Sequence, residues 1–176
     1  MKILMSFFAL ILLISSCTNS ANQANIDSSG EKDTINYPFK TNSSANYVPG
    51  DKKNIVLVLN CLQKYIDNDI KGCVSYFADS AEFIADRFDF KGSRDSLQTI
   101  IAAMRGASAS VSKNFDTWAA LYYPDVNENW VTLWYTEVMK DKNGKIDSIY
   151  YTDDVLLKNG KIVLYDEKQR LFPAKK

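Results

Sequence analysis

The side chains in this sequence that could carry acid–base chemistry are carboxylates, tyrosines and lysines, because the chain contains no histidine. Catalytic sites of the Ser-His-Asp or Cys-His type, and zinc sites built on imidazole, are therefore excluded. The clearest cluster of acids lies in the predicted hairpin around Asn159-Gly160, which carries Asp153, Asp154, Asp166 and Glu167. The pairing of the two strands decides which of these acids meet.

An Asn-Gly dipeptide between two apolar runs predicts a two-residue turn between paired strands. That turn places Leu157 opposite Ile162 and, further along, Asp153 opposite Asp166. Opposed residues project from the same side of a sheet, so both carboxylates would end the more apolar face, which we expect to cover the helices. If they are enclosed, repulsion raises one pKa and leaves a shared proton, an arrangement suited to general acid–base catalysis. Asp153 and Asp166 are accordingly the candidate catalytic residues.

A simpler interpretation, which we favour, is that the strands emerge into water at this point and that Lys168 and Arg170 neutralise the acids. The pairing also depends on the length of the turn, because a shift of one residue moves every side chain to the other face. Asp154 with Glu167 is the alternative pair.

Many aromatic side chains fall in predicted strands, where they could line a cavity for an apolar ligand. The more common role of such residues is to fill a core or an interface between sheets. The candidate ligand-binding residues are Tyr65, Trp118, Trp134, Tyr151 and Asp153. Trp134 and its neighbours Leu133 and Tyr135 alternate between the two faces of one strand, so both faces carry bulk. This pattern favours a homodimer that pairs through the sheet.

Helices are predicted first along the chain. One begins at Asp51, a favourable N-cap residue, and repeats apolar side chains at Ile55, Leu59, Leu62 and Ile66. The remaining predicted elements are a short helix from Asp69, a strand at 81–84, a helix from Asp95 (with Gln98 in a capping box) to Gly106, and strands at 115–123, 130–140, 145–157 and 162–172. Helices followed by an antiparallel meander predict an α+β domain over residues 51–176.

The two cysteines of this domain, Cys61 and Cys73, lie on neighbouring predicted helices. They could form a disulfide in an oxidising compartment, or they could be two buried free thiols. Acidic and basic residues each number 21 in the whole chain, which gives no long-range field for attracting nucleic acid. We expect no metal and no cofactor.

The first residues have the parts of a secretory signal, with Lys2 followed by an apolar core and by Ser15-Ser16. The core is shorter than the ~20 residues that span a bilayer. The sequence Ile14-Ser15-Ser16-Cys17 resembles the bacterial lipobox, in which the signal is cut before a cysteine that receives lipid. The resemblance implies a signal peptide at 1–16, lipidation of Cys17, and attachment to a Gram-negative outer membrane facing the periplasm, because Thr18 stands where an aspartate would mark inner-membrane retention.

Residues 17–50 are mostly polar and predict a flexible tether with an end-to-end distance of roughly 30 Å. Two segments interrupt it, Tyr37-Pro38-Phe39 and Tyr47-Val48-Pro49, and either could dock on the domain.

The domain resembles the NTF2-like superfamily, which includes SnoaL-like proteins and ketosteroid isomerases. The resemblance rests on residues 65–83, with the turn Phe77-Ala78-Asp79, and on residues 154–162, with Gly160-Lys161-Ile162. It implies three helices packed on a curved sheet, a cone with a pocket at its wide end, and in many members a dimer formed through the sheet.

The isomerase residues themselves are not matched. The resemblance places Cys61 where the isomerases have an oxyanion-binding tyrosine and Ala85 where they have the general base, with Asp86 one position late. Only their second oxyanion-hole acid has a candidate, Asp153 or Asp154. We therefore expect a lipid-anchored, non-catalytic module that binds a small apolar ligand or a protein partner. The alternatives are a SnoaL-like enzyme using pocket carboxylates for isomerase, cyclase or hydrolase chemistry, and a structural envelope protein whose cone is filled.

Overall fold

The computed structural model describes residues 36–171, and at Leu171 the backbone alone. The chain divides into two compact units, Met1–Phe39 and Lys40–Lys176, and every described helix and strand belongs to the second. The signal peptide, Cys17 and most of the predicted tether lie outside the described residues. Within residues 36–171, no helix is long and apolar enough to cross a membrane.

Two of the three predicted helices begin where their N-cap residues indicate. Helix α1 spans Lys52–Ile66, and the Asp51 carboxylate accepts a hydrogen bond from the backbone N–H of Lys53 at 2.8 Å. Helix α2 spans Ile70–Val74, with Asp69 as its cap. These side chains satisfy backbone donors that the first turn of a helix leaves without partners.

Helix α3 spans Arg94–Gly106, and its N-cap is Ser93. The predicted capping box at Asp95 is therefore wrong, because the Ser93 hydroxyl already accepts from the backbone N–H of Ser96 at 3.2 Å. Asp95 lies inside the first turn, where a negative charge still interacts favourably with the helix dipole.

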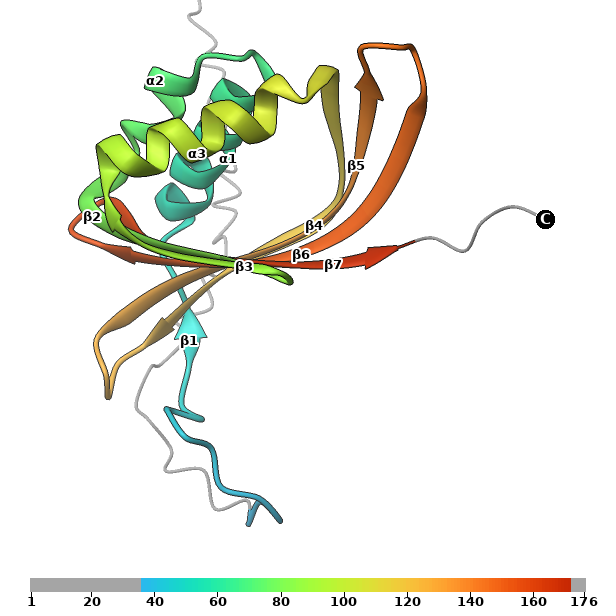
Figure 1. Ribbon diagram of the computed structural model, residues 1–176. Helices are drawn as coiled ribbons and strands as arrows, with labels where there is room; N and C mark the ends of the chain where they lie inside the picture. The colour runs from blue at the N-terminus through green and yellow to red at the C-terminus, as the bar shows by residue number, and fades with distance from the viewer. Residues whose placement is uncertain (1–35, 172–176) are drawn as a thin grey trace, which may run out of the picture. The chain divides into compact units, whose positions relative to one another are not determined.

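Seven strands form one sheet in the order β1-β4-β5-β6-β7-β2-β3. The strands are β1 (Val48–Pro49), β2 (Phe77–Ala85), β3 (Phe88–Ser93), β4 (Ser108–Tyr123), β5 (Glu128–Asp141), β6 (Ile146–Lys158) and β7 (Lys161–Leu171). The β2–β7 pair is parallel and the other pairs are antiparallel. The predicted four-strand meander is confirmed as β4 to β7, and the three helices cover the concave face of the bent sheet (Figure 1).

Two short strands extend the predicted sheet. Val48 and Pro49 pair with Tyr122 and Leu121, which confirms that this part of the predicted tether docks on the domain. Strand β3 was not predicted, although Phe88-Asp89-Phe90-Lys91 alternates apolar and charged side chains as a strand does. It lies at the edge of the sheet, where most of its side chains are exposed.

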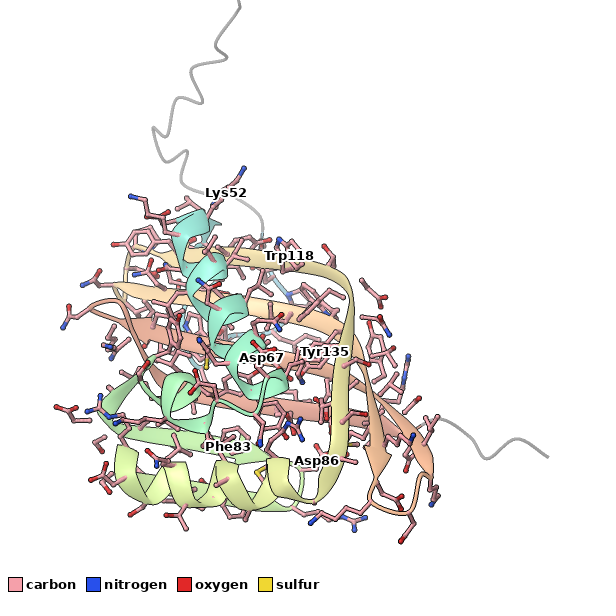
Figure 2. The ribbon with its side chains drawn as sticks, turned by 90° about the horizontal axis from the view of Figure 1, so that it is seen from above. Lys52, Asp67, Phe83, Asp86, Trp118 and Tyr135 are labelled. Atoms are coloured by element: carbon pink, nitrogen blue, oxygen red, sulfur yellow. The ribbon has the colours of Figure 1, made fainter. Side chains whose placement is uncertain are left out.

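The core lies between the concave face of the sheet and the helices. Val58 and Cys61 of α1 and Leu97 of α3 are almost completely buried. They pack against Val131, Leu133, Tyr135, Val155 and Ile162 of the sheet, none of which is exposed. Figure 2, viewed from the helix side, shows α1 running over the sheet from Lys52 toward Asp67, with α3 lying beyond the carboxyl end of α1.

The buried side chain of Arg105 joins α3 to the carboxyl end of α1. Its guanidinium donates to the carbonyl oxygens of Tyr65 at 3.0 Å, Ile66 at 3.1 Å and Ser108 at 3.0 Å. The two carbonyls of α1 belong to its last turn, where few backbone N–H groups remain to bond them, although the Tyr65 carbonyl also accepts from the backbone N–H of Asn68 at 3.0 Å. Arg105 therefore fixes the junction of α1, α3 and β4.

We expect Arg105→Met to lower the free energy of unfolding by about 2–3 kcal/mol, because three carbonyl groups lose a charged donor. Urea denaturation checks the value. Arg87→Met, at an exposed position in the turn between β2 and β3, is the matched control and should change stability little. Equal stability of the two variants would contradict the role assigned to Arg105.

Candidate functional site

The last hairpin contains a β-bulge that changes which acids face each other. Leu157 pairs with Ile162 as predicted, but Leu156 pairs with Leu164, so Val163 is the extra residue on β7. From that point the pairing is shifted by one residue. The predicted opposition of Asp153 to Asp166 is wrong, and so is the alternative pair of Asp154 with Glu167.

The observed pairs are Asp153 with Glu167, and Asp154 with Asp166. Asp153 lies on the inner face of the sheet with no exposed surface, so the interpretation that this end of the hairpin emerges into water is wrong for Asp153. It is correct for the outer pair, because Lys168 reaches both Asp154 at 2.9 Å and Asp166 at 2.7 Å. The bulge thus separates a pair on the inner face, with Asp153 buried and Glu167 half-buried, from a pair on the outer face that Lys168 neutralises.

The carboxylate of Asp153 is held by two tyrosine hydroxyls. Tyr135 donates to Oδ2 at 2.7 Å, and Tyr165 donates to the same oxygen in a shorter contact. The other oxygen, Oδ1, is buried without a hydrogen-bond partner. Burial raises the pKa of Asp153 to about 6, although the positive charge of Lys113 and the two hydroxyl donors act in the opposite direction.

Glu167, opposite Asp153, has the more strongly shifted pKa of the pair. Burial first, and then repulsion from the Asp153 carboxylate, raise the pKa of Glu167 to about 8, while the charge of Lys113 lowers it. At neutral pH Glu167 is therefore mainly protonated and Asp153 mainly ionised. One of the two opposed carboxyls is thus an acid and the other an anion, as we predicted for two carboxyls enclosed together.

A buried ion pair lies beside these carboxyls. Lys113 of β4 and Glu137 of β5 are paired across the strands, and their side chains are only 3% and 6% exposed. The Lys113 ammonium donates to Glu137 in a short contact and to the Tyr135 hydroxyl at 3.0 Å. It also lies 4.2 Å from the centre of the Tyr135 ring, so a lysine and three carboxyls share one partly enclosed region.

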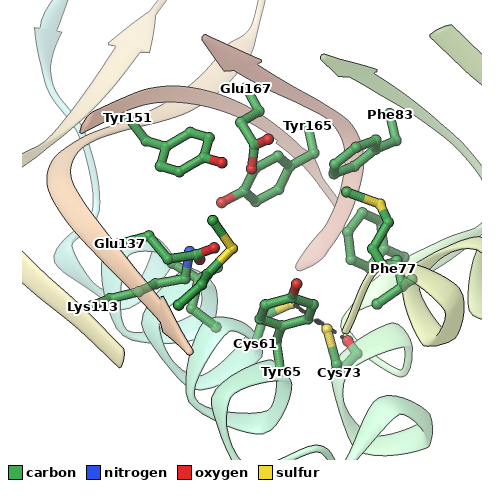
Figure 3. Close-up of a pocket in the computed structure, with 14 residues that line it drawn as sticks. Cys61, Tyr65, Cys73, Phe77, Phe83, Lys113, Glu137, Tyr151, Tyr165 and Glu167 are labelled. Atoms are coloured by element: carbon green, nitrogen blue, oxygen red, sulfur yellow. Dashed lines mark hydrogen bonds and ion pairs between the residues drawn. The ribbon is translucent and has the colours of Figure 1, made fainter. Parts of the chain in front are cut away.

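These groups surround a pocket of about 140 Å³ between the sheet and the helices. Its lining residues are Cys61, Leu62, Tyr65, Cys73, Phe77, Phe83, Ile101, Met104, Lys113, Glu137, Met139, Tyr151, Tyr165 and Glu167. Figure 3 shows the hydroxyls of Tyr151 and Tyr165 and the carboxyl of Glu167 pointing toward one another, with Glu137 and Lys113 beside them. The pocket is mainly apolar, and its polar groups converge from adjacent strands.

The predicted ligand-binding residues fall in three places. Tyr65 and Tyr151 line the pocket, and Asp153 lies behind it, in contact through Tyr165. Trp118 is 45% exposed at the end of the sheet where α1 begins (Figure 2). Trp134 pairs with Thr152 on the outer face of the sheet. The two tryptophans thus take no part in the pocket.

Asp166, the second predicted catalytic residue, borders a different hollow on the outer face. That hollow has a volume of about 300 Å³, and its lining residues are Ser43, Ser44, Leu121, Tyr123, Glu128, Trp130, Thr132, Asp154 and Asp166. Since Asp166 and Asp153 lie on opposite faces of the sheet, they do not form one site.

Cys61 and Cys73 meet at the helix side of the pocket. Both are buried free thiols, with their sulfur atoms 3.6 Å apart. The hydrogen bond between the thiols and their burial raise the pKa of Cys61, which makes its thiolate less available. Among residues 36–170, no three His, Cys, Asp or Glu side chains are placed to hold a metal ion.

Two charged pocket residues, Lys113 and Glu137, were not predicted from the sequence, and Glu167 was named only in the alternative pair with Asp154. A signal for Lys113 and Glu137 was present in the sequence. Lys113 falls on the same strand face as Val111 and Phe115, and Glu137 falls on the same face as Leu133 and Tyr135. A charge at an inward position of an otherwise apolar strand indicates a site. Glu167 had no such signal, since its face depends on the bulge.

The remaining isomerase positions can also be located. Ala85 is the last residue of β2 and carries no acid, while Asp86 is exposed in the next turn and accepts from the backbone N–H of Gln169 at 3.4 Å. The pocket carboxyls therefore come from the long strands, on the side of the pocket opposite the cysteines (Figure 3).

No protein-family model and no curated protein matches this sequence, so the comparisons that inform the fold are with solved structures. An LEH-like epoxide hydrolase from M. tuberculosis is 12% identical, with a TM-score of 0.56 over 68% of this chain and 84% of that one. AusH from Aspergillus nidulans is 9% identical (TM-score 0.57, covering 70% and 87%), and Aln2 from a Streptomyces species is 15% identical (TM-score 0.54, covering 69% and 94%). The three helices and the bent, mostly antiparallel sheet thus form an α+β cone of the NTF2-like, SnoaL-like kind.

Proposed function

We propose that this domain is an enzyme that adds water to a small, neutral and largely apolar substrate by acid–base catalysis. The observation that carries the proposal is the placement of a protonated carboxyl, Glu167, and an ion-paired carboxylate, Glu137, around one apolar pocket. The sequence alone favoured a non-catalytic binding module. A pocket reached by carboxyls favours the enzymatic alternative.

The two carboxyls suit opposite halves of the reaction. Glu137 takes a proton from water as the water oxygen bonds to an electrophilic carbon. The bond from that carbon to the leaving oxygen breaks, and Glu167 gives its proton to that oxygen. The proton gained by Glu137 then returns to Glu167 through solvent, so that one water molecule is consumed. Lys113 holds the Glu137 carboxylate in position through their ion pair.

The isomerase arrangement of donors is not matched in this pocket. An isomerase that forms an enolate needs donors that stabilise an oxyanion. The hydroxyl protons of Tyr135 and Tyr165 are both bonded to Asp153, and a buried thiol of Cys61 stands where the isomerases have a tyrosine donor. A protonated carboxyl, Glu167, and an ion-paired carboxylate, Glu137, remain.

Small epoxides are the substrate class that we propose for this pair. Their ring opens when the oxygen is protonated while water attacks a ring carbon, and the product is a diol. One of the structurally similar proteins is an LEH-like epoxide hydrolase, a likeness that by itself concerns the fold. The pocket volume of about 140 Å³ suits a single ring or a short chain.

We further propose that the domain works at a membrane surface as an outer-membrane lipoprotein facing the periplasm. The support is the lipobox-like sequence ending at Cys17, because acyl chains on this residue would add ~0.8 kcal/mol of membrane affinity for each buried methylene. A homodimer through the outer face of the sheet is part of this proposal, since Trp130 and Trp134 are half-buried there.

We expect purified protein to convert styrene oxide or cyclohexene oxide to the diol, and Glu167→Gln to lower kcat by about 10²- to 10⁴-fold, because glutamine cannot donate the proton. Gas chromatography of the products measures this. Glu128→Gln, outside the pocket, is the control and should keep its activity. If no epoxide is hydrolysed by the unaltered protein, water addition is excluded and a binding role is favoured.

The pH dependence should report Glu167 directly. The reaction needs its protonated form, so kcat/KM should fall as pH rises above about 8, by about tenfold for each pH unit. The residual activity of Glu167→Gln should lack this decline. Constant kcat/KM up to pH 9.5 in the unaltered protein would remove Glu167 as the acid.

Replacing Cys17 by serine should abolish lipid attachment, because the hydroxyl does not substitute for the thiol in that reaction. We expect Cys17→Ser to move the protein from the membrane fraction to the soluble fraction after cell lysis. Cys61→Ser is the control and should leave the distribution unchanged. Membrane association that survives Cys17→Ser would refute the anchor.

A further inference from the structure

The hydroxyl groups of Tyr135 and Tyr165 both donate their single proton to one atom, Asp153 Oδ2. A phenol hydroxyl that donates inward can act only as an acceptor on its other side. The Tyr135 oxygen already accepts from Lys113 at 3.0 Å. In the described part of the chain, no group donates to the Tyr165 oxygen, so its acceptor capacity is unused.

The Tyr165 side chain lines the pocket, and its hydroxyl points toward Tyr151 and Glu167 (Figure 3). Asp153 has no exposed surface and cannot touch a ligand itself. Its effect on the pocket is therefore indirect. By accepting the Tyr165 proton, it fixes a hydrogen-bond acceptor on the sheet side of the pocket.

The charges around the pocket restrict what can bind there. Lys113 is the one basic residue among the described residues that line it, and its ammonium is engaged by Glu137 and Tyr135. Glu137 and Asp153 carry negative charge in the same region, so an anionic ligand would meet repulsion without a free cation. A neutral ligand is favoured.

The volume adds a second restriction. A cavity of roughly 150 Å³ is known to hold benzene in another protein, and this pocket has about 140 Å³. Apolar side chains of Phe77, Phe83 and Ile101 form much of its wall. One six-membered ring therefore fills it.

We propose that Asp153 is a positioning residue, and that through Tyr165 it makes the pocket selective for neutral, ring-sized ligands that carry a hydroxyl group. The ligand hydroxyl donates to the Tyr165 oxygen and accepts from Glu167. The inference goes beyond the proposed function, because it concerns hydroxyl-bearing ligands of the same pocket, such as the diol product, and not the epoxide. It rests on that proposal only for the choice of site.

The test compares phenol with anisole, which has the same ring and oxygen but no hydroxyl proton. Binding is measured at pH 7 by isothermal titration calorimetry, with benzoate as the anionic probe. The unaltered protein should bind phenol about tenfold more tightly than anisole, the difference expected for one hydrogen bond. Benzoate should bind more weakly than phenol.

Tyr165→Phe should reduce the phenol-to-anisole ratio to about one, because the acceptor is lost while the ring remains. Tyr150→Phe, a matched substitution on the outer face of β6, should keep the tenfold preference. Asp153→Asn keeps an acceptor oxygen for both tyrosines and should preserve the preference, whereas Asp153→Leu frees the Tyr165 proton and should remove it. Circular dichroism verifies that each variant is folded.

Equal affinity of the unaltered protein for phenol and anisole would overturn the inference, as would a tenfold preference that survives in Tyr165→Phe. Failure of both compounds to bind, or benzoate binding as tightly as phenol, would also overturn it. None of these measurements involves turnover. A phenol preference that persists in an inactive Glu167→Gln variant separates this inference from the proposed catalytic role.

Discussion

The enclosed carboxylate of Asp153 is the constraint on which the arrangement of the pocket depends. A carboxylate without solvent is costly unless its charge is compensated or its proton is retained. Here two tyrosine hydroxyls donate to Oδ2 and compensate the charge, while burial still raises the pKa of Asp153 to about 6. The bulge at Val163 makes this possible, since it turns Tyr165 and Glu167 to the inner face beside Asp153. A single extra residue in β7 thus creates the pair of acids and their hydrogen-bond partner together.

The ion pair of Lys113 with Glu137 is a second polar feature that stability alone does not explain. Burying both charges costs solvation free energy that their attraction only partly returns, and apolar residues of the same size often serve a fold as well. Locally unfavourable choices of this kind are typical of functional sites. Because both residues face the same pocket as Glu167, the fold keeps one polar cluster inside an otherwise apolar region.

The elements of the fold could largely be predicted from the sequence, and the site only in part. Asp51 and Asp69 mark helix starts because a cap is a local interaction, and Asn159-Gly160 marks the hairpin for the same reason. The bulge at Val163 has no such local signal, yet it exchanges the faces of Asp166 and Glu167. The prediction of two opposed carboxyls therefore named Asp153 correctly and was wrong in its partner. Strand β3 escaped prediction although its sequence alternates, because the alternating run of Phe88 to Lys91 is only four residues long.

Measuring the protonation state of Glu167 tests the proposed acid–anion pair most directly. Carbon-13 NMR of the glutamate side-chain carboxyls, recorded from pH 4 to pH 10 with Glu167→Gln to assign the signal, measures it without any substrate. We expect the Glu167 carboxyl signal to titrate near pH 8, with a smaller change in its chemical shift near pH 6 as Asp153 ionises. Titration of Glu167 near its ordinary value of 4.5 would show that its carboxyl is solvated and would contradict the enclosed acid–anion pair.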